Sequence, residues 1–165
     1  MPYEMKVDGM TEISELLSKM EDEAPKAAAR ALYEGAGIMA DEIRKGAETI
    51  KTGQGASRSE ARYATPAEKE IVLTAAAGIA KFRKNGTEVD TSVGFQNSGY
   101  AELDGKMVPI PKIVNSINSG TSFMHKQPFV RKAANKAAPK AMEAMRKQIE
   151  AEFEAIGRGY QSSLK

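Results

Sequence analysis

Two long stretches of this chain repeat apolar residues at helical spacing, and they constrain the fold more than any other feature. One stretch covers residues 11–50 and the other follows Pro128. Such a stripe is typical of an amphipathic helix that packs on one face. The stripes comprise Ala28, Leu32, Ala36, Met39, Ile43, Ala47 and Ile50 in the first, and Val130, Ala133, Ala134, Ala137, Ala141, Met145, Ile149, Phe153 and Ile156 in the second.

A proline marks a possible break inside the first stretch. Thr11 is suited to the N-cap position, but Pro25 follows Asp22 and Glu23 within the stretch. Proline is tolerated in a first helical turn and disfavoured inside a helix. We therefore expect either a kinked helix or two consecutive helices over residues 11–50.

The second stretch has clear signals at both ends. Pro128 suits a first helical turn because its φ is fixed near the helical value. Pro139 should kink the helix, and Gly157 fits the position just after a helix end. Residues 157–165 are then expected to form a frayed tail. Phe129 stands where a loop enters the helix, so we predict that its large ring anchors that loop to the core.

The first stretch is unusually slim, because alanine and glycine dominate residues 27–40. Glycine inside a helix costs about 1 kcal/mol relative to alanine. Gly35 and Gly37 therefore indicate a close contact, without identifying what makes it. Packing within the chain is the favoured interpretation, and a contact between subunits through Gly35 is the alternative.

Residues 51–64 show no apolar period, and we expect a flexible surface loop there. Arg58 and Arg62 in this loop are interpreted as solvated charges, with a contact to phosphate or to a partner's carboxylates as the alternative. The segment Thr65-Pro66-Ala67-Glu68 then has the form of a capping box at a helix start. A short helix should run to about Ala77, with Ile71, Val72 and Leu73 on its buried side.

Asn85-Gly86 predicts a β-hairpin with a two-residue type I′ turn, because both central residues need positive φ. Lys84 then faces Thr87, and Phe82 faces Val89. In this register the apolar face comprises Ala80, Phe82, Val89, Thr91, Val93 and Phe95, and the opposite face pairs Arg83 with Glu88 and Lys81 with Asp90. We predict that Phe82 and Val89 are core anchors and that Asn85 and Gly86 form the exposed tip.

Between the hairpin and the second stretch, the sequence predicts a loop over residues 94–105 and a third strand over residues 107–110. Prolines 109 and 111 favour an edge position for that strand. A short helix should follow and close near Gly120. Its apolar side would comprise Ile110, Ile113, Val114 and Ile117.

The length of the chain favours one domain over residues 1–165, and the predicted helices and strands make it an α+β fold. The core must rely on Leu, Ile, Val and nine Met, since Trp is absent and aromatic residues make up 6% of the chain. Such a core is shallow, and assembly would bury more apolar surface. The formal net charge is +2, and acidic and basic residues are interspersed over the chain as a whole. A strong nucleic-acid binder usually concentrates its cations on one face.

Nothing in the sequence points to catalysis, and we expect neither an enzyme nor a cofactor. The chain has no cysteine and a single histidine, His125, so a zinc site is not expected. His125 is interpreted as a surface residue, with a pH-sensitive contact as the alternative. Phosphate-cradling glycine motifs and nucleophile elbows are absent from the sequence. No apolar run reaches about 18 residues and no secretion signal is apparent, so no membrane partner is expected.

The order from Ser119 to Ala133, Gly-Thr, loop, then Pro-Phe-x-Arg-x-Ala, resembles the tail-completion (head-tail joining, or neck) family of tailed double-stranded DNA bacteriophages. The resemblance covers most of the chain, including the N-terminal helix, the hairpin and the C-terminal helix. It implies a structural virion protein that forms a ring oligomer, binds phage neck or tail proteins, and meets DNA only as passing cargo. It would reside in the virion and, during assembly, in the cytoplasm of the bacterial host. The candidate assembly contacts are Gly35, Asn85, Gly86, Gly120, Thr121, Phe123 and Gln127.

Two alternatives remain open at this point. Within the same class, the chain would be a tail-terminator subunit that caps the tail tube. In another class, it would be an architectural DNA-binding protein that places the 79–95 hairpin in a groove. Lys81, Arg83 and Lys84 favour the latter, but Glu88 and Asp90 on the other strand largely offset their charge.

Overall fold

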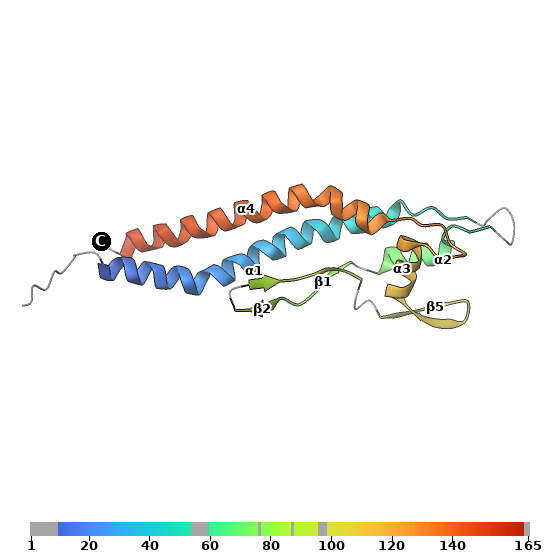
Figure 1. Cartoon of the computed structure of the whole chain (residues 1–165), viewed down its shortest axis with the longest axis horizontal. Coiled ribbons are helices and arrows are strands. Elements are labelled where there is room, and N and C mark those ends of the chain that lie inside the picture. The colour runs from blue at the N-terminus through green and yellow to red at the C-terminus, as the bar shows by residue number, and fades with distance from the viewer. Residues whose placement is uncertain (1–9, 54–59, 76, 87, 96–98, 164–165) are drawn as a thin grey trace, which may run out of the picture.

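The computed structural model describes residues 10–53, 60–75, 77–86, 88–95 and 99–163. Two long helices, α1 (Met10–Glu48) and α4 (Phe129–Ser163), dominate this part of the chain. They lie side by side in opposite directions, so that α1 begins and α4 ends at the same end of the molecule (Figure 1). The remaining elements are α2 (Pro66–Thr74), β1 (Gly78–Ile79), β2 (Arg83–Asn85), β3 (Glu88–Asp90), β4 (Val93–Gly94), β5 (Tyr100–Leu103), β6 (Lys106–Pro109) and α3 (Ile110–Ser119). This element order is an α+β fold, as expected.

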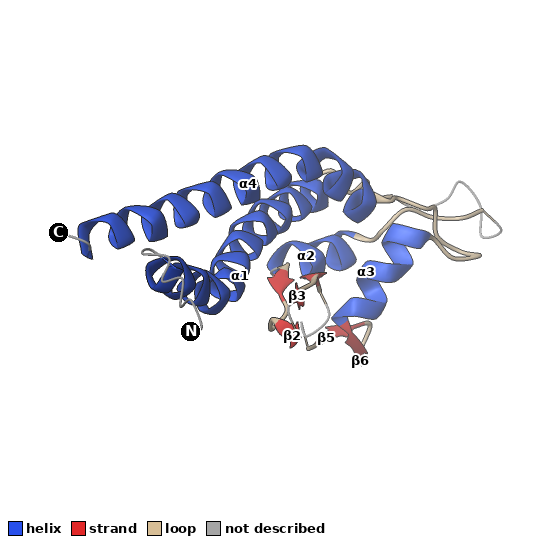
Figure 2. Cartoon of the chain, turned by 60° about the vertical axis from the view of Figure 1, so that its left-hand side comes forward, coloured by secondary structure: helices blue, strands red, loops and turns tan. Residues whose placement is uncertain are grey.

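The molecule has three parts, which we call the stalk, the arm and the head. The stalk comprises residues 10–39 of α1 and 137–163 of α4. The arm, residues 78–94, is a hairpin that lies along α1. The head comprises the described residues of 40–77 and 95–136. Figure 2 shows α2 and α3 beside the end of the long helix pair, with β5 and β6 at the outer end of α3.

Both long helices continue through the prolines and glycine that the sequence suggested would interrupt or end them. α1 is one helix with Pro25 inside it, and it changes direction along its length (Figure 1). α4 includes Pro139 and passes through Gly157 to Ser163, so Gly157 does not occupy the position after a helix end. Packing of the two helices along their length outweighs these local penalties.

Small residues line the contact between the two long helices. Ala27, Ala31, Ala137 and Ala141 are each at most 1% exposed. A Cβ on Gly35 would lie 2.7 Å from Cγ of Met145, so the Met145 side chain covers Gly35. The favoured interpretation of Gly35, packing within the chain, is therefore confirmed.

The main core lies in the head, where larger side chains meet. Ile43 from α1, Val72 from α2 and Ile117 from α3 are its largest fully buried members. Phe129, at the start of α4, is 4% exposed and packs with its ring 6.4 Å from that of Phe95. Phe129 thus belongs to the core, as predicted. Further members are Ala40, Ala47, Ile50, Ala64, Ala75, Ala77, Ile110, Ile113, Val114, Met124 and Ala133.

The arm is an antiparallel hairpin, but its register differs from the predicted one. Asn85 lies opposite Glu88 and Arg83 lies opposite Asp90, whereas the predicted register placed Arg83 opposite Glu88. Nearer the base, Ile79 pairs with Val93. Three residues of the first strand therefore face two of the second, which is the arrangement of a β-bulge. Val89 and Val93 stay on one face of the second strand, while the extra residue of the first strand changes which of its side chains share that face.

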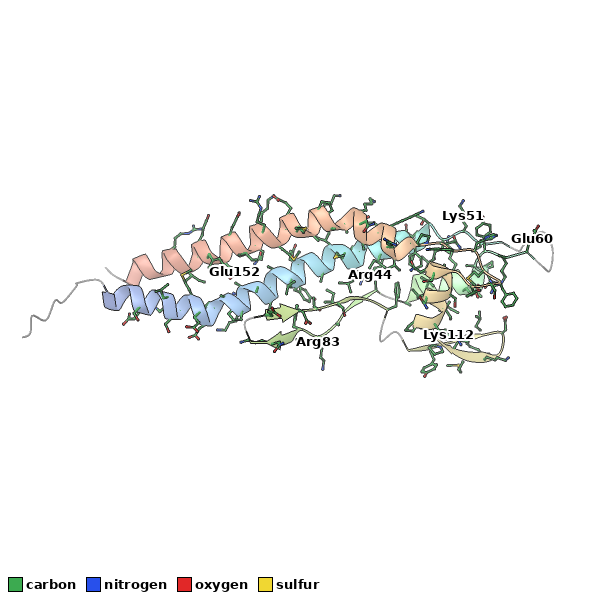
Figure 3. The ribbon with its side chains drawn as sticks, in the orientation of Figure 1. Arg44, Lys51, Glu60, Arg83, Lys112 and Glu152 are labelled. Carbon is green, nitrogen blue, oxygen red and sulfur yellow. The ribbon has the colours of Figure 1, made fainter. Side chains whose placement is uncertain are left out.

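The bulge also changes what Phe82 does. Phe82 is 38% exposed and lies outside the main core, so its predicted role as a core anchor is wrong. Its ring instead packs 6.3 Å from the ring of Tyr33 on α1. Val89 is half-buried, and β3 contacts α1. The charged face is solvated as expected, with Arg83 pointing away from α1 (Figure 3).

A second hairpin, β5–β6, was not predicted. Residues 94–105 were expected to form a loop, yet Tyr100–Leu103 pairs with Lys106–Pro109. The turn between them is Asp104-Gly105, with φ values of 50° and 74°. Two consecutive positive φ values are what a type I′ turn requires. The strand at 106–109 therefore has a partner of its own and does not join the arm.

The two short helices begin as predicted. Thr65 and Glu68 form the capping box of α2, which ends at Thr74 rather than near Ala77. Val72 is buried, but Leu73 is 41% exposed, contrary to expectation. α3 buries its four predicted apolar residues and closes at Gly120.

Candidate assembly surface of the head

The segment 120–127 is an ordered loop whose tip presents an aromatic ring. Gly120 has a φ of 76°, and a Cβ there would lie 3.0 Å from the backbone of Lys126. Thr121 and Met124 exchange two backbone hydrogen bonds of 3.0 and 3.3 Å, which closes a tight turn. Phe123 lies in that turn with 77% of its surface exposed, whereas Met124 is buried.

Residues 60–64 hold this turn from the side. The backbone N–H of Arg62 donates to the carbonyl of Phe123 over 2.9 Å, and His125 N–H donates to the Arg62 carbonyl over 2.8 Å. The ring of Tyr63 packs 4.8 Å from that of His125. The exposed ring of Phe123 therefore projects from a backbone that is fixed on both sides.

Gln127 fixes the other end of the loop. Its Nε2 donates to the Lys51 carbonyl over 3.0 Å, and its Oε1 accepts the Lys51 N–H over 2.7 Å. Its own N–H donates to the Ile117 carbonyl over 2.9 Å. Gln127 thus joins the end of α1, the end of α3 and the start of α4.

Beneath the loop lies an ion pair that the sequence interpretation missed. Arg62 donates two hydrogen bonds to the Glu68 carboxylate, of 2.7 and 2.8 Å, and Glu68 is 5% exposed. Burial raises the pKa of Glu68, but the hydrogen bonds and charge of Arg62 and the Thr65 amide outweigh it and lower the pKa below 4.5. Arg62 is therefore a structural residue rather than a solvated charge. Arg58 lies outside the described residues.

A shallow cavity of about 240 Å³ separates this ion pair from the exposed ring. Arg62, Lys112, Ser116 and Phe123 line it, together with Glu68, Leu103, Val108, Ile113, Thr121 and Met124. Its polar groups come from one ion pair, one lysine and two hydroxyls. Across the described ranges, no three acidic or histidine side chains lie close enough to hold a metal ion. None of the described helices is long and apolar enough to span a membrane.

Two further apolar side chains are exposed on the β5–β6 hairpin. Tyr100 is 66% exposed and Met107 is 65% exposed. Glu102 lies opposite Met107 in the register, which places Tyr100 and Met107 diagonally on one face. The other face, with Ala101, Leu103 and Val108, packs on the core. We call Phe123, Tyr100 and Met107 the apolar tips of the head.

The predicted assembly contacts therefore fall into three groups. Phe123, Thr121, Asn85 and Gly86 are exposed, although Asn85 and Gly86 lie on the arm and not on the head. Gly120 and Gln127 are half-buried and serve the loop itself. Gly35 is buried in the stalk. Sequence reasoning missed Tyr100 and Met107, although the Asp104-Gly105 turn signal could have found their hairpin.

In comparisons with known proteins, no family model, curated protein or solved structure matches the chain.

Proposed function

We propose that this chain is a structural virion protein of a tailed phage or prophage, which joins head to tail or completes the tail at the neck through oligomeric assembly. The observation that carries the proposal is the exposure of Phe123 on a fixed turn. A second motivation is the resemblance of the Gly-Thr, loop, Pro-Phe order to the tail-completion family. The tail-terminator role remains the alternative within the same class.

The fixed turn supports a binding role for energetic reasons. A large apolar ring that is 77% exposed gains free energy when a partner covers it. Because hydrogen bonds from residues 62 and 125 already order the backbone, binding would cost little further conformational entropy. Tyr100 and Met107 add apolar surface at the same end of the molecule, where the head lies (Figure 1).

Assembly through these residues would bring different surfaces of two subunits together. Such a head-to-tail contact closes into a ring when the rotation between subunits permits it. The stalk would then extend from each copy as a spacer. No chemical step is involved, so the protein would act by geometry alone.

The first test is the oligomeric state of Phe123→Ser against that of Met142→Ser. Met142 is 67% exposed on α4 and serves as a matched control, because both exchanges remove one exposed apolar side chain. In native mass spectrometry we expect rings or multimers for the original protein and for Met142→Ser. We expect monomers for Phe123→Ser. Equal assembly of both variants would show that Phe123 is not the contact.

The second test concerns the partner. The protein should co-purify with neck or tail proteins of the phage or prophage from which it comes. Recovery with connector proteins would support a joining role, and recovery with the tail tube would support a terminator. A monomer that binds none of these proteins would overturn the proposal.

A further inference from the structure

One part of the chain departs from the interspersed charge pattern. Between Gly105 and Met142 the sequence contains Lys106, Lys112, Lys126, Arg131, Lys132, Lys136 and Lys140, and no aspartate or glutamate. The chain as a whole has 22 acidic residues, so a segment of this length without any is unusual. The segment includes the 120–127 loop and residues 129–141 of α4.

The fold brings several of these lysines together with lysines from α1. Two adjoining cavities, of about 250 and 340 Å³, share Thr49, Lys132 and Phe129 in their walls. They lie where α1 ends beside the first turns of α4, at the position of Lys51 in Figure 3. We call them together the lysine groove. Its cationic lining residues are Lys45, Lys51, Lys126, Lys132 and Lys136.

Most of this charge is not neutralised within the chain. Glu42 is the acidic side chain that lines the groove, and it pairs with Lys136 at 2.8 Å and with Lys45 at 3.4 Å. Within the part of the chain that the structure describes, Lys51, Lys126 and Lys132 take part in no side-chain ion pair. All three are exposed.

Stability does not explain the placement of Lys126 and Lys132. Cations are favoured near helix C-termini and disfavoured near N-termini, because of the helix dipole. Lys126 and Lys132 flank the N-terminus of α4, whose first turn contains no acidic residue. Lys132, Lys136 and Lys140 also follow at four-residue intervals on one helix face, where like charges repel. A local cost of this kind is expected at a functional surface.

We propose that the lysine groove binds the phosphate backbone of double-stranded DNA. Lysine ammonium groups recognise phosphates as point charges, without reading sequence. An acidic peptide is a weaker fit, because the large apolar residues of the groove, Ile50 and Phe129, are 3% and 4% exposed and offer no side-chain pocket. A single strand is also a weaker fit, since the ring of Tyr63 is already packed against His125.

This inference does not depend on the proposed assembly function. Assembly relies on Phe123 and the apolar tips, whereas DNA binding relies on lysines at the junction of α1 and α4. Either surface can fail its test without affecting the other. The binding assay therefore uses the whole chain, and its oligomeric state is recorded in parallel.

The test compares two triple variants that change the net charge equally. Lys51→Glu, Lys126→Glu and Lys132→Glu alter the groove, whereas Lys81→Glu, Arg83→Glu and Lys84→Glu alter the arm. Affinity for a short labelled duplex is measured by fluorescence anisotropy over a range of salt concentrations. We expect the groove variant to lose affinity on the order of a hundredfold at about 0.1 M salt, and the magnitude of its log–log salt slope to fall by about 3. The arm variant should retain most of the affinity.

Several outcomes would overturn the proposal. They are no binding of the original protein at low salt, an equal loss in both triple variants, or stronger competition by polyglutamate than by unlabelled duplex. The first removes DNA as a ligand, the second indicates a general charge effect or a role for the arm, and the third favours an acidic protein. Circular dichroism of each variant checks that a loss of binding does not reflect unfolding.

Discussion

The head and the stalk are built from the same two helices, but different side chains hold them together. In the head, Ile43 of α1 and Phe129 of α4 share a core with residues from α2 and α3. In the stalk, the buried contacts of the helix pair are mostly alanines, with Gly35 beneath Met145. Small residues let helices approach closely but remove little apolar area from water. The comparison indicates that stability is concentrated in the head.

The ion pairs of the head and the stalk also differ in how deeply they are buried. The head ion pair, Arg62 with Glu68, is partly buried and is joined to a helix cap. In the stalk, Arg30 donates hydrogen bonds of 2.6 and 2.7 Å to Glu152, and this pair joins α1 to α4 near the surface. Glu152 lies along the stalk in Figure 3. Exposed pairs contribute little because water and salt screen them.

The largest expected effect comes from removing a core isoleucine in the head. Ile117→Ala should lower the free energy of unfolding by about 4 kcal/mol, because a fully buried side chain leaves a cavity. Ile149→Ala in the stalk should cost about 1 kcal/mol, since Ile149 is only half-buried. Urea unfolding followed by circular dichroism measures both. Equal losses would contradict a division of stability between head and stalk.

A smaller effect, with a pH signature, is expected at Glu68. The lowered pKa means that Glu68 stabilises the fold above the pKa of the unfolded chain, and that this contribution is lost as pH falls through the folded pKa. Glu68→Gln should cost about 2 kcal/mol at neutral pH, because Arg62 loses a charged acceptor. The variant and the original protein should converge once the pH has fallen through the folded pKa of Glu68, which lies below its ordinary value.

The control for this experiment is Glu70→Gln on the same helix. Glu70 is exposed, and its exchange should leave the dependence of stability on pH unchanged. Thermal unfolding at a series of pH values measures both variants. A constant difference between Glu68→Gln and the original protein down to low pH would mean that the ion pair does not control this titration.

The smallest effect distinguishes two glycines in α1. A Cβ on Gly46 would lie 3.2 Å from the carbonyl oxygen of Phe129, which is backbone and cannot rotate away. Gly46→Ala should therefore cost about 1 kcal/mol despite the higher helix propensity of alanine. At Gly35 the obstacle is the flexible Met145 side chain, so Gly35→Ala should be nearly neutral.

A double variant sharpens this last comparison. With Met145→Ala in the background, Gly35→Ala should become stabilising by up to about 1 kcal/mol, because only the propensity gain remains. Differential scanning calorimetry of the four combinations measures the coupling. An effect of Gly35→Ala that is independent of residue 145 would show that Met145 does not cover this glycine in solution.

Local signals in the sequence predicted most of the helices and their buried faces. The capping box of α2, the four apolar residues of α3 and the stripe along α4 involve neighbouring residues, and the structure confirms them except at Phe153, which is 37% exposed. The ends of helices were harder to predict where the helix packs against a distant part of the chain. Gly157 and Pro25 favour breaks locally, but long-range contact between α1 and α4 overrides these preferences.

Features that depend on distant partners were missed for a related reason. The arm register differs from the predicted one because the first strand contains an extra residue, which forms a bulge. The pattern of residues within the hairpin alone does not predict this bulge. Arg62 was interpreted as solvated because its partner, Glu68, was interpreted only as a capping residue. The β5–β6 hairpin was overlooked although Asp104-Gly105 is a local signal of the same kind as Asn85-Gly86.

The candidate surfaces were predicted only in part. Phe123 was identified from its loop, and the structure leaves it exposed. Gln127 was expected to be available to a partner, yet its amide bonds to Lys51, which is far away in sequence. The lysine groove combines α1 with α4, so overall composition concealed it, although the run without acidic residues between Gly105 and Met142 was visible.

The antiparallel course of α1 and α4 has a mechanical consequence. Because α1 begins where α4 ends, a force that pulls these two ends apart would peel the helices from each other one turn at a time, like a zipper. Each step would break only a few alanine contacts, so the stalk should open at low force. The opening would halt at Ile43 and Phe129, where the load meets the interlocked side chains of the head.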